Sequence, residues 1–302
     1  MSVSFPRLAA FAVALLVLLP AGLLAAPART AVISAFPPEL AALRAALTEP
    51  EEKALKGVAF VTGRLEGRPV VLFPSGISMV NAAMTTQLAL DHFPVKRIVF
   101  SGIAGGVDPA LNIGDVIVAE RWGQYLELVL ARKTPEGWQT PPFFTYPHAN
   151  YGMMFPRSVT VQQPAGGKPE TRFWFPVDKE LLALAREAAE DVTLKRCHAD
   201  GTCLSAAPRV LIGGNGVSGS AFVDNADFRA YVENTFEARL LDMESAAVAH
   251  VAYANGVPFI AFRSLSDLAG GGDGENELTT FFQLAADNAA AVVRAFFARL
   301  PD

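Results

Sequence analysis

Positive charge, histidine and cysteine are all scarce in this sequence of 302 residues. It holds 25 Lys and Arg against 30 Asp and Glu, a net charge of −5, and its nearest approach to a basic cluster is the pair Lys195-Arg196. A protein that follows a phosphate backbone needs a basic stripe, so we expect no nucleic-acid partner. With four His and two Cys, clusters of metal ligands are lacking as well. We predict a small ligand that is not a polyanion, no metal and no organic cofactor.

The two cysteines, Cys197 and Cys203, flank a short segment of polar and small residues. Their spacing is not the Cys-x-x-Cys of a redox site, and a metal site is disfavoured because His198 is the only further ligand nearby. In an oxidising compartment two such cysteines close a small surface loop. We therefore predict a structural disulfide between them.

Only one long apolar run is present, at residues 8–24, and it follows a single charge at Arg7. An Ala-Pro-Ala exit comes next at residues 26–28, which is typical of a secretory signal peptide. The alternative is a transmembrane anchor, but the run is shorter than the roughly 20 residues of a spanning helix, and Pro20 interrupts it. We predict a signal peptide over 1–28, an exported (periplasmic or secreted) protein, and no membrane attachment after cleavage.

The rest of the chain, residues 29–302, alternates short β-branched runs with amphipathic stretches. Strands are predicted at 30–36, 58–60, 70–73, 97–101, 115–119, 209–212, 240–242 and 259–263, and helices at 39–47, 81–93, 178–189, 227–234, 244–254 and 277–300. This alternation predicts one α/β domain, a three-layer α/β/α sandwich around a mixed, mainly parallel sheet. A segment crowded with Pro, Gly and aromatic residues, about 134–172, is predicted to be an insertion or a lid.

Three acids, Glu39, Glu244 and Asp267, each follow a predicted strand. Ligands of open α/β sheets bind outside the carboxyl ends of the strands, so these side chains are expected to line one cleft. Structural roles are also open: two of the acids lie in the first turn of a helix, where the helix dipole favours an anion, and the alternative role of the third is to cap a turn. Cleavage of a C–N bond at a sugar needs an acid that protonates the leaving nitrogen group and a general base that takes a proton from water. It also needs a negative group beside the positive charge that develops on the sugar.

Longer motifs extend this interpretation. They are Ser101-Gly102-Ile103-Ala104-Gly105-Gly106, then Val217-Ser218-Gly219-Ser220-Ala221-Phe222-Val223, then Leu241-Asp242-Met243-Glu244-Ser245-Ala246-Ala247 and finally Phe262-Arg263-Ser264-Leu265-Ser266-Asp267. In this order they resemble the nucleoside phosphorylase/nucleosidase superfamily, and within it the 5′-methylthioadenosine/S-adenosylhomocysteine nucleosidases. The resemblance implies a purine nucleoside as substrate, a nucleoside phosphorylase-like fold and a homodimer.

The resemblance also implies roles for single residues. Asp267 matches the acid that protonates N7 of the purine, Glu39 the carboxylate that activates water, and Glu244 the acid that holds the ribose hydroxyls. The remaining positions form the implied binding set: Met243 against the sugar, Phe222 stacked on the base, the backbone of Val223 at the base edge, Ile77 and Phe36 near the 5′ side, and Ser266.

The sequence departs from the family pattern at three places. Ile103 stands where Ser or Thr is common, and residues 124–127 replace a more usual Arg-Tyr-His-Asp segment near the partner subunit. Phe100 occupies the position of an arginine that phosphorylases carry, which favours hydrolysis over phosphorolysis.

A second resemblance points to another class of function. The segments 221–226 and 264–272, the cysteine pair and the signal peptide are similar to plant bark and vegetative storage proteins, which share the fold. A nucleoside-binding or storage protein of little or no activity, and a phosphorylase, therefore remain the alternatives to an exported purine nucleosidase.

Overall fold

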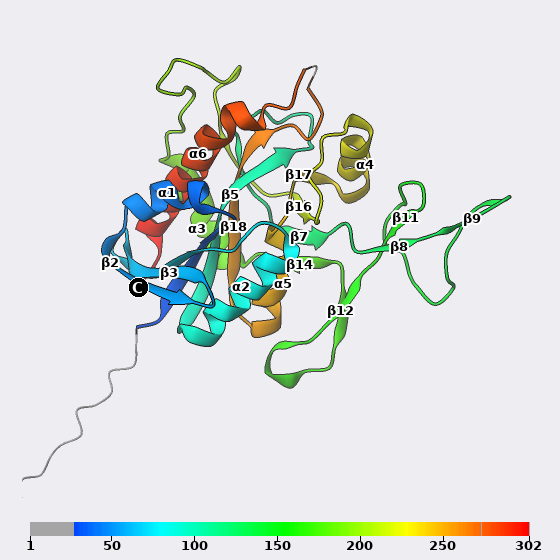
Figure 1. The fold of residues 1–302 in the computed structure, drawn as a ribbon, viewed down its shortest axis with the longest axis horizontal. Coiled ribbons are helices and arrows are strands. Elements are labelled where there is room, and N and C mark those ends of the chain that lie inside the picture. The colour runs from blue at the N-terminus through cyan, green and yellow to red at the C-terminus, as the bar shows by residue number, and fades with distance from the viewer. Residues whose placement is uncertain (1–26, 273, 302) are drawn as a thin grey trace, which may run out of the picture.

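The computed structural model describes residues 27–272 and 274–301 (Figure 1). The predicted signal peptide lies outside the described residues, apart from Pro27 and Ala28, and so stays a prediction. Within the described part of the chain, no helix combines the length and the apolar character needed to cross a bilayer.

A single 12-stranded sheet forms the centre of the fold, with the path β14-β7-β16-β17-β5-β1-β4-β3-β2 and with β18, β6 and β15 attached beside it. Its strands are β1 Arg29–Ser34, β2 Thr48–Leu55, β3 Val58–Leu65, β4 Arg68–Pro74, β5 Val95–Gly106, β6 Val116–Val118, β7 Arg121–Gln124, β14 Trp174–Pro176, β15 Val210–Ile212, β16 Asn215–Ser218, β17 Ala238–Asp242 and β18 Phe259–Asp267. The inner strands β4, β1, β5 and β18 run parallel, whereas β2, β3 and β14 add antiparallel edges. The predicted mixed sheet is confirmed.

Helices cover both faces of this sheet. They are α1 Pro37–Ala45, α2 Met79–His92, α3 Lys179–Glu190, α4 Ala226–Phe236, α5 Ser245–Asn255 and α6 Leu278–Arg299. Helix α2 packs against α5, while α1 and α3 pack against α6, so the helices form two separate layers (Figure 1). Helix α6 buries a row at helical spacing that includes Leu284, Val292 and Phe296. The predicted three-layer α/β/α architecture is therefore confirmed.

Several parts of the sheet differ from the sequence prediction, including β7 and β14, which were not predicted. The strand predicted at 97–101 was too short: β5 continues to Gly106, because β18 pairs with it as far as Asp267. Strand β2 was missed because it is exposed along almost its whole length and has no apolar alternation. Strand β16 was missed because three glycines, at positions 213 and 214 just before it and 216 within it, favour a loop.

Residues 128–172 leave the body of the molecule as an arm of short hairpins (Figure 1). Its elements are β8 Leu128–Leu130, β9 Arg132–Thr134, β10 Gly137–Gln139, β11 Met154–Pro156, β12 Val159–Val161, a short 3₁₀ turn η1 Pro164–Gly166 and β13 Glu170–Arg172. The arm rests on α4, where the Tyr231 hydroxyl donates a hydrogen bond to the carbonyl of Ala149 at 2.8 Å. Elsewhere on the surface, between α3 and β15, Cys197 and Cys203 form the predicted disulfide.

Candidate active site

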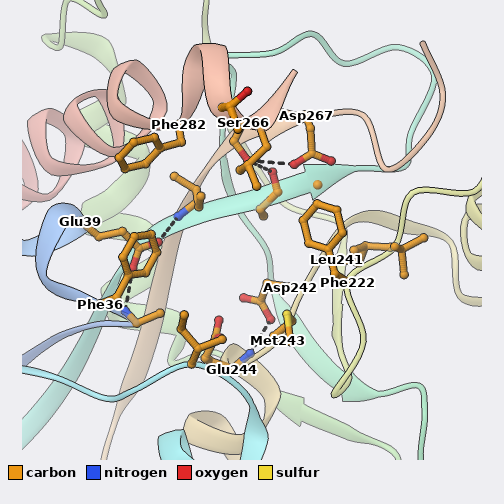
Figure 2. A pocket seen from close by; sticks show the side chains of 18 residues that line it. Phe36, Glu39, Phe222, Leu241, Asp242, Met243, Glu244, Ser266, Asp267 and Phe282 are labelled. Atoms are coloured by element: carbon orange, nitrogen blue, oxygen red, sulfur yellow. Dashed lines mark hydrogen bonds between the residues drawn. The ribbon is translucent and has the colours of Figure 1, made fainter. Parts of the chain in front are cut away.

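A cavity of about 360 Å³ opens at the carboxyl ends of the central strands (Figure 2). Every residue predicted for the site lines it: Phe36, Glu39, Ile77, Phe222, Val223, Met243, Glu244, Ser266 and Asp267. Strand β5 explains this convergence, because it pairs with β1, β17 and β18, the three strands at whose ends the acids lie. The structure thus brings the predicted residues together, and Figure 2 shows the three acids around the cavity from different sides.

Glu39 lies in the first turn of α1, which Pro37 and Pro38 begin. Its carboxylate accepts hydrogen bonds from the backbone N–H of Ala35 at 2.6 Å and of Ile103 at 2.8 Å. Burial raises the pKa of Glu39 above its ordinary value. Arg263 and these N–H groups oppose that rise but do not cancel it. The side chain therefore links the β1–α1 loop to β5 and is well placed to accept a proton.

Glu244 follows β17 as the residue just before α5, and its side chain does not cap that helix. It accepts the Ser78 N–H at 2.8 Å and an N–H of Arg263 at 3.3 Å. Ser78 has a φ of 78° and a ψ of 163°, a conformation that residues other than glycine rarely adopt, and this turns its N–H toward Glu244. Burial raises the pKa of Glu244 to about 7.

Asp267 is the last residue of β18. Its carboxylate accepts the Ala269 N–H and the Ser266 hydroxyl, both at 2.9 Å, so the predicted turn-capping role also holds. Burial raises the pKa of Asp267 above its ordinary value, although these donors and the side chain of Asn276 oppose the rise. No arginine or lysine is bonded to Asp267 among the described residues, so a proton is retained here more easily than on an exposed Asp.

Arg263 received no role from the sequence, yet it occupies the centre of the acids with none of its side chain exposed. Its Nε lies 2.8 Å from a carboxylate oxygen of Asp242, and its Nη1 donates to the Ile103 carbonyl at 3.3 Å. The guanidinium also lies over the Phe100 ring, 3.9 Å from the centroid. A single charged residue inside the apolar strand sequence of β18 was the available signal for it.

The wall formed by α6 was also missed. Leu278, Thr279 and Phe282 line the cavity, and Phe282 stacks on Phe36 with ring centroids 6.2 Å apart. Since these residues lie at the start of a long amphipathic helix, no sequence pattern distinguishes them from core positions.

Some residues considered from the sequence lie elsewhere. No described residue of 134–172 is among those that line the cavity. His148 packs on Phe173 with ring centroids 4.3 Å apart, and His250 stacks on Phe175 at 4.7 Å, so neither joins the acids. Across the described ranges, no group of His, Cys, Asp and Glu has the arrangement of a metal site.

The glycine at position 102 is required by this packing. A Cβ there would overlap both Arg263 and Glu39. We expect Gly102→Ala to displace these buried charges and to lower the free energy of unfolding by about 3–5 kcal/mol, the usual cost of disrupting a buried ion pair. Urea unfolding measures this. Gly272→Ala is the matched control, because nothing lies within 4 Å of its Cβ; equal stabilities of the two variants would contradict the expectation.

Asp267 should destabilise the folded protein at high pH. Because burial raises its pKa in the folded state, the unfolded chain loses the proton first, so the stability present below the ordinary Asp pKa of about 4 is lost as the pH rises through the raised value. We expect Asp267→Asn to be more stable than wild type at about pH 8, with the difference shrinking toward pH 4. Urea unfolding at several pH values tests this, and a difference that is constant with pH would refute it.

Comparisons with known proteins show the family of this chain. Residues 29–298 match the sequence profile of the family described as the Phosphorylase superfamily. The 5′-methylthioadenosine/S-adenosylhomocysteine nucleosidase of Bacillus cytotoxicus is 31% identical over 244 residues, which is 80% of this chain and 87% of that protein. The enzyme of the same name from Mycobacterium bovis is 27% identical over 266 residues, covering 87% and 94%.

A solved structure supports the same assignment. The 5′-methylthioadenosine/S-adenosylhomocysteine nucleosidase of S. pneumoniae, determined with a transition-state inhibitor, superposes with a TM-score of 0.67 at 25% identity and covers 90% of this chain and 100% of its own. The predicted superfamily is confirmed: this chain belongs to the Phosphorylase superfamily.

Proposed function

We propose that this protein is a purine nucleosidase, which hydrolyses the N-glycosidic bond to release the free base and the sugar. The observation that carries the proposal is the placement of three buried carboxylates, Glu39, Glu244 and Asp267, around one cavity in a chain of this superfamily. The relatives named above are nucleosidases, and their similarity extends over most of this chain.

Asp267 is the proposed general acid. Its raised pKa favours the protonated form, which can donate to N7 of the purine and make the base a better leaving group. Phe222 projects at the cavity with 57% of its surface exposed, available to stack on that base. As the C–N bond lengthens, the electron pair leaves with the base and positive charge develops on the sugar.

Glu39 and Glu244 act on the other side of the bond. Glu39 is the proposed base that takes a proton from the attacking water, and its raised pKa suits that task. Glu244 is the proposed acceptor for the ribose hydroxyls, with Met243 beside the sugar. Both carboxylates also place negative charge near the developing cation, which lowers the barrier electrostatically.

Water, rather than phosphate, is the proposed nucleophile. The backbone N–H groups of Ala35 and Ile103, which would suit an anion, are both occupied by Glu39. No Lys, Arg or His is among the described residues that line the cavity. Arg263 lies behind the wall with its N–H groups bound to Asp242, Ser245, Ile103 and Glu244.

The 5′ side of the cavity is apolar. Phe36, Ile77, Leu278 and Phe282 form it, and these side chains offer no hydrogen bond to a free 5′ hydroxyl. An alkylthio group fits such a surface better than a hydroxyl does, because an unsatisfied buried hydroxyl costs free energy. We therefore propose 5′-thio-substituted adenosines, such as 5′-methylthioadenosine or S-adenosylhomocysteine, as the substrate class.

One observation favours the alternative of a binding or storage protein. Ile103 lies in the cavity wall where the family commonly has Ser or Thr, so one polar contact near the acids is absent. A protein of that kind would bind a purine nucleoside without turnover.

The decisive assay measures release of free base from 5′-methylthioadenosine, S-adenosylhomocysteine, adenosine and inosine, with and without phosphate. We expect release without phosphate, fastest for the 5′-thio nucleosides, and a loss of about 10²–10⁴-fold in kcat for Asp267→Asn, the usual contribution of general acid catalysis. Tyr146→Phe, in the arm, is the matched control and should keep wild-type kcat, because Tyr146 does not line the cavity. Release that requires phosphate would indicate a phosphorylase; binding without release would indicate a storage or binding protein.

We further propose an exported homodimer. A disulfide is the kind of bond that persists outside the cytoplasm, and it accompanies the N-terminal apolar run. Ile77, Val80 and Met84 are 51%, 77% and 61% exposed beside the cavity, and a group of exposed apolar side chains marks an interface.

Both statements can be tested on protein recovered from its native cell. We expect the extracytoplasmic fraction to hold a chain that begins at Pro27 or Arg29 by mass spectrometry, with a mass in light scattering of about twice the monomer. An intact Met1 in a membrane fraction would contradict cleavage. A monomer would contradict the dimer, and Val80→Glu is the variant expected to produce one.

A further inference from the structure

Four buried ionisable side chains meet at the wall of the cavity, and only one of them is a cation. Arg263 faces three carboxylates, those of Asp242, Glu39 and Glu244, and all four residues are at most 5% exposed. The guanidinium is shared unequally. Its nearest N–O separations are 2.8 Å to Asp242, 3.3 Å to Glu244 and 3.9 Å to Glu39. Only the first has the short distance of a strong charge-assisted hydrogen bond.

Asp242 is held firmly in this position. Its Oδ1 accepts the hydroxyl of Ser218 and the backbone N–H groups of Glu244 at 3.2 Å and Ser245 at 3.1 Å. Its Oδ2 accepts the hydroxyl of Ser245 and faces the Nε of Arg263. Asp242 therefore fixes two things at once: the backbone that carries Glu244, and the direction in which the guanidinium points.

We propose that Asp242 is a positioning residue. It holds the guanidinium of Arg263 close to its own carboxylate and farther from Glu39 and Glu244, so that these two acids stay strong proton and hydrogen-bond acceptors. This inference deepens the proposed function and rests on it for the roles of those two acids. Asp242 has no free oxygen to offer a substrate, since donors from the protein meet both of its oxygens.

The charges around the two acids are consistent with this division. Burial is the largest cause of the raised pKa of Glu244. Of the charged neighbours of Glu244, Arg263 lowers this pKa, whereas Asp242 and Glu39 raise it further. Around Glu39 the charged neighbour is Arg263, with the N–H groups of Ala35, Phe36 and Ile103. Without the charge of Asp242, Glu244 loses a neighbour that raises its pKa. The guanidinium of Arg263 is also released to move toward Glu39, from which it is now 3.9 Å away, so we expect both pKa values to fall.

The test is Asp242→Asn, which keeps the shape and removes the charge. Glu39 must be deprotonated to act as the base, so activity declines as the pH falls through its pKa. We expect the acid limb of kcat/KM for 5′-methylthioadenosine to move about 1 pH unit lower in the variant. Ser218→Ala is the control: it removes a donor to Asp242 but leaves the charge, so the acid limb should stay in place. An unmoved limb in Asp242→Asn would overturn the proposal.

A second readout does not depend on catalysis. Carboxyl ¹³C NMR of glutamate-labelled protein, with the Glu244 signal assigned by Glu244→Gln, follows the titration directly. We expect the wild-type signal to titrate near pH 7 and to move about 1 unit lower in Asp242→Asn. If no nucleoside is cleaved, the proposed function fails, but this shift in the pKa of Glu244 still tests whether Asp242 holds Arg263 away from the other two acids. If Asp242→Asn does not fold, Asp242→Ser, which also removes the charge, takes its place: a lower Glu244 pKa than in wild type upholds the proposal, and an unmoved titration overturns it.

Discussion

The burial of one guanidinium among carboxylates is the constraint on which the rest of this site depends. Removing an ion from water costs several kcal/mol, so Arg263 is tolerated only because every side of it is occupied by a partner. Asp242 and Ser245 meet its Nε, the Phe100 ring lies beneath it, and the bare backbone of Gly102 leaves it room. The positions of the acids therefore serve to neutralise this buried cation as well as to bind a substrate.

Strand β5 supplies the geometry that makes this arrangement possible. It is hydrogen-bonded to β1, β17 and β18, and it continues through a glycine-rich sequence to Gly106. Because three strand ends meet along one strand, acids that are far apart in the sequence lie around one cavity. A strand that ended at Gly102 would leave Asp267 without its pairing at Gly105, and the third acid would not be fixed.

Much of this could be predicted from the sequence, for identifiable reasons. Alternating strands and helices gave the layers, and acids placed after strands gave the cavity, because both depend on local pattern and on a general rule for parallel sheets. The role of Arg263 could not be predicted, since its partners come from β5, β17 and α5 and are not adjacent in sequence. Glycine was the other source of error. In residues 102–106 it allows buried side chains such as those of Arg263, Glu39 and Asp267 to pack directly against the backbone of β5. From the sequence pattern alone, the same glycines indicate a loop.

The charge balance also bears on the choice of nucleophile. Three carboxylates and one guanidinium leave the buried cluster with an excess of negative charge whenever more than one of the acids is ionised. At about 5 Å and an effective dielectric constant of about 20, each pair of like unit charges costs about 3 kcal/mol. A dianionic phosphate would meet that cost beside Glu39 and Glu244, while a neutral water molecule does not. The same excess favours a sugar on which positive charge develops, so one electrostatic feature disfavours phosphorolysis and assists the proposed hydrolysis.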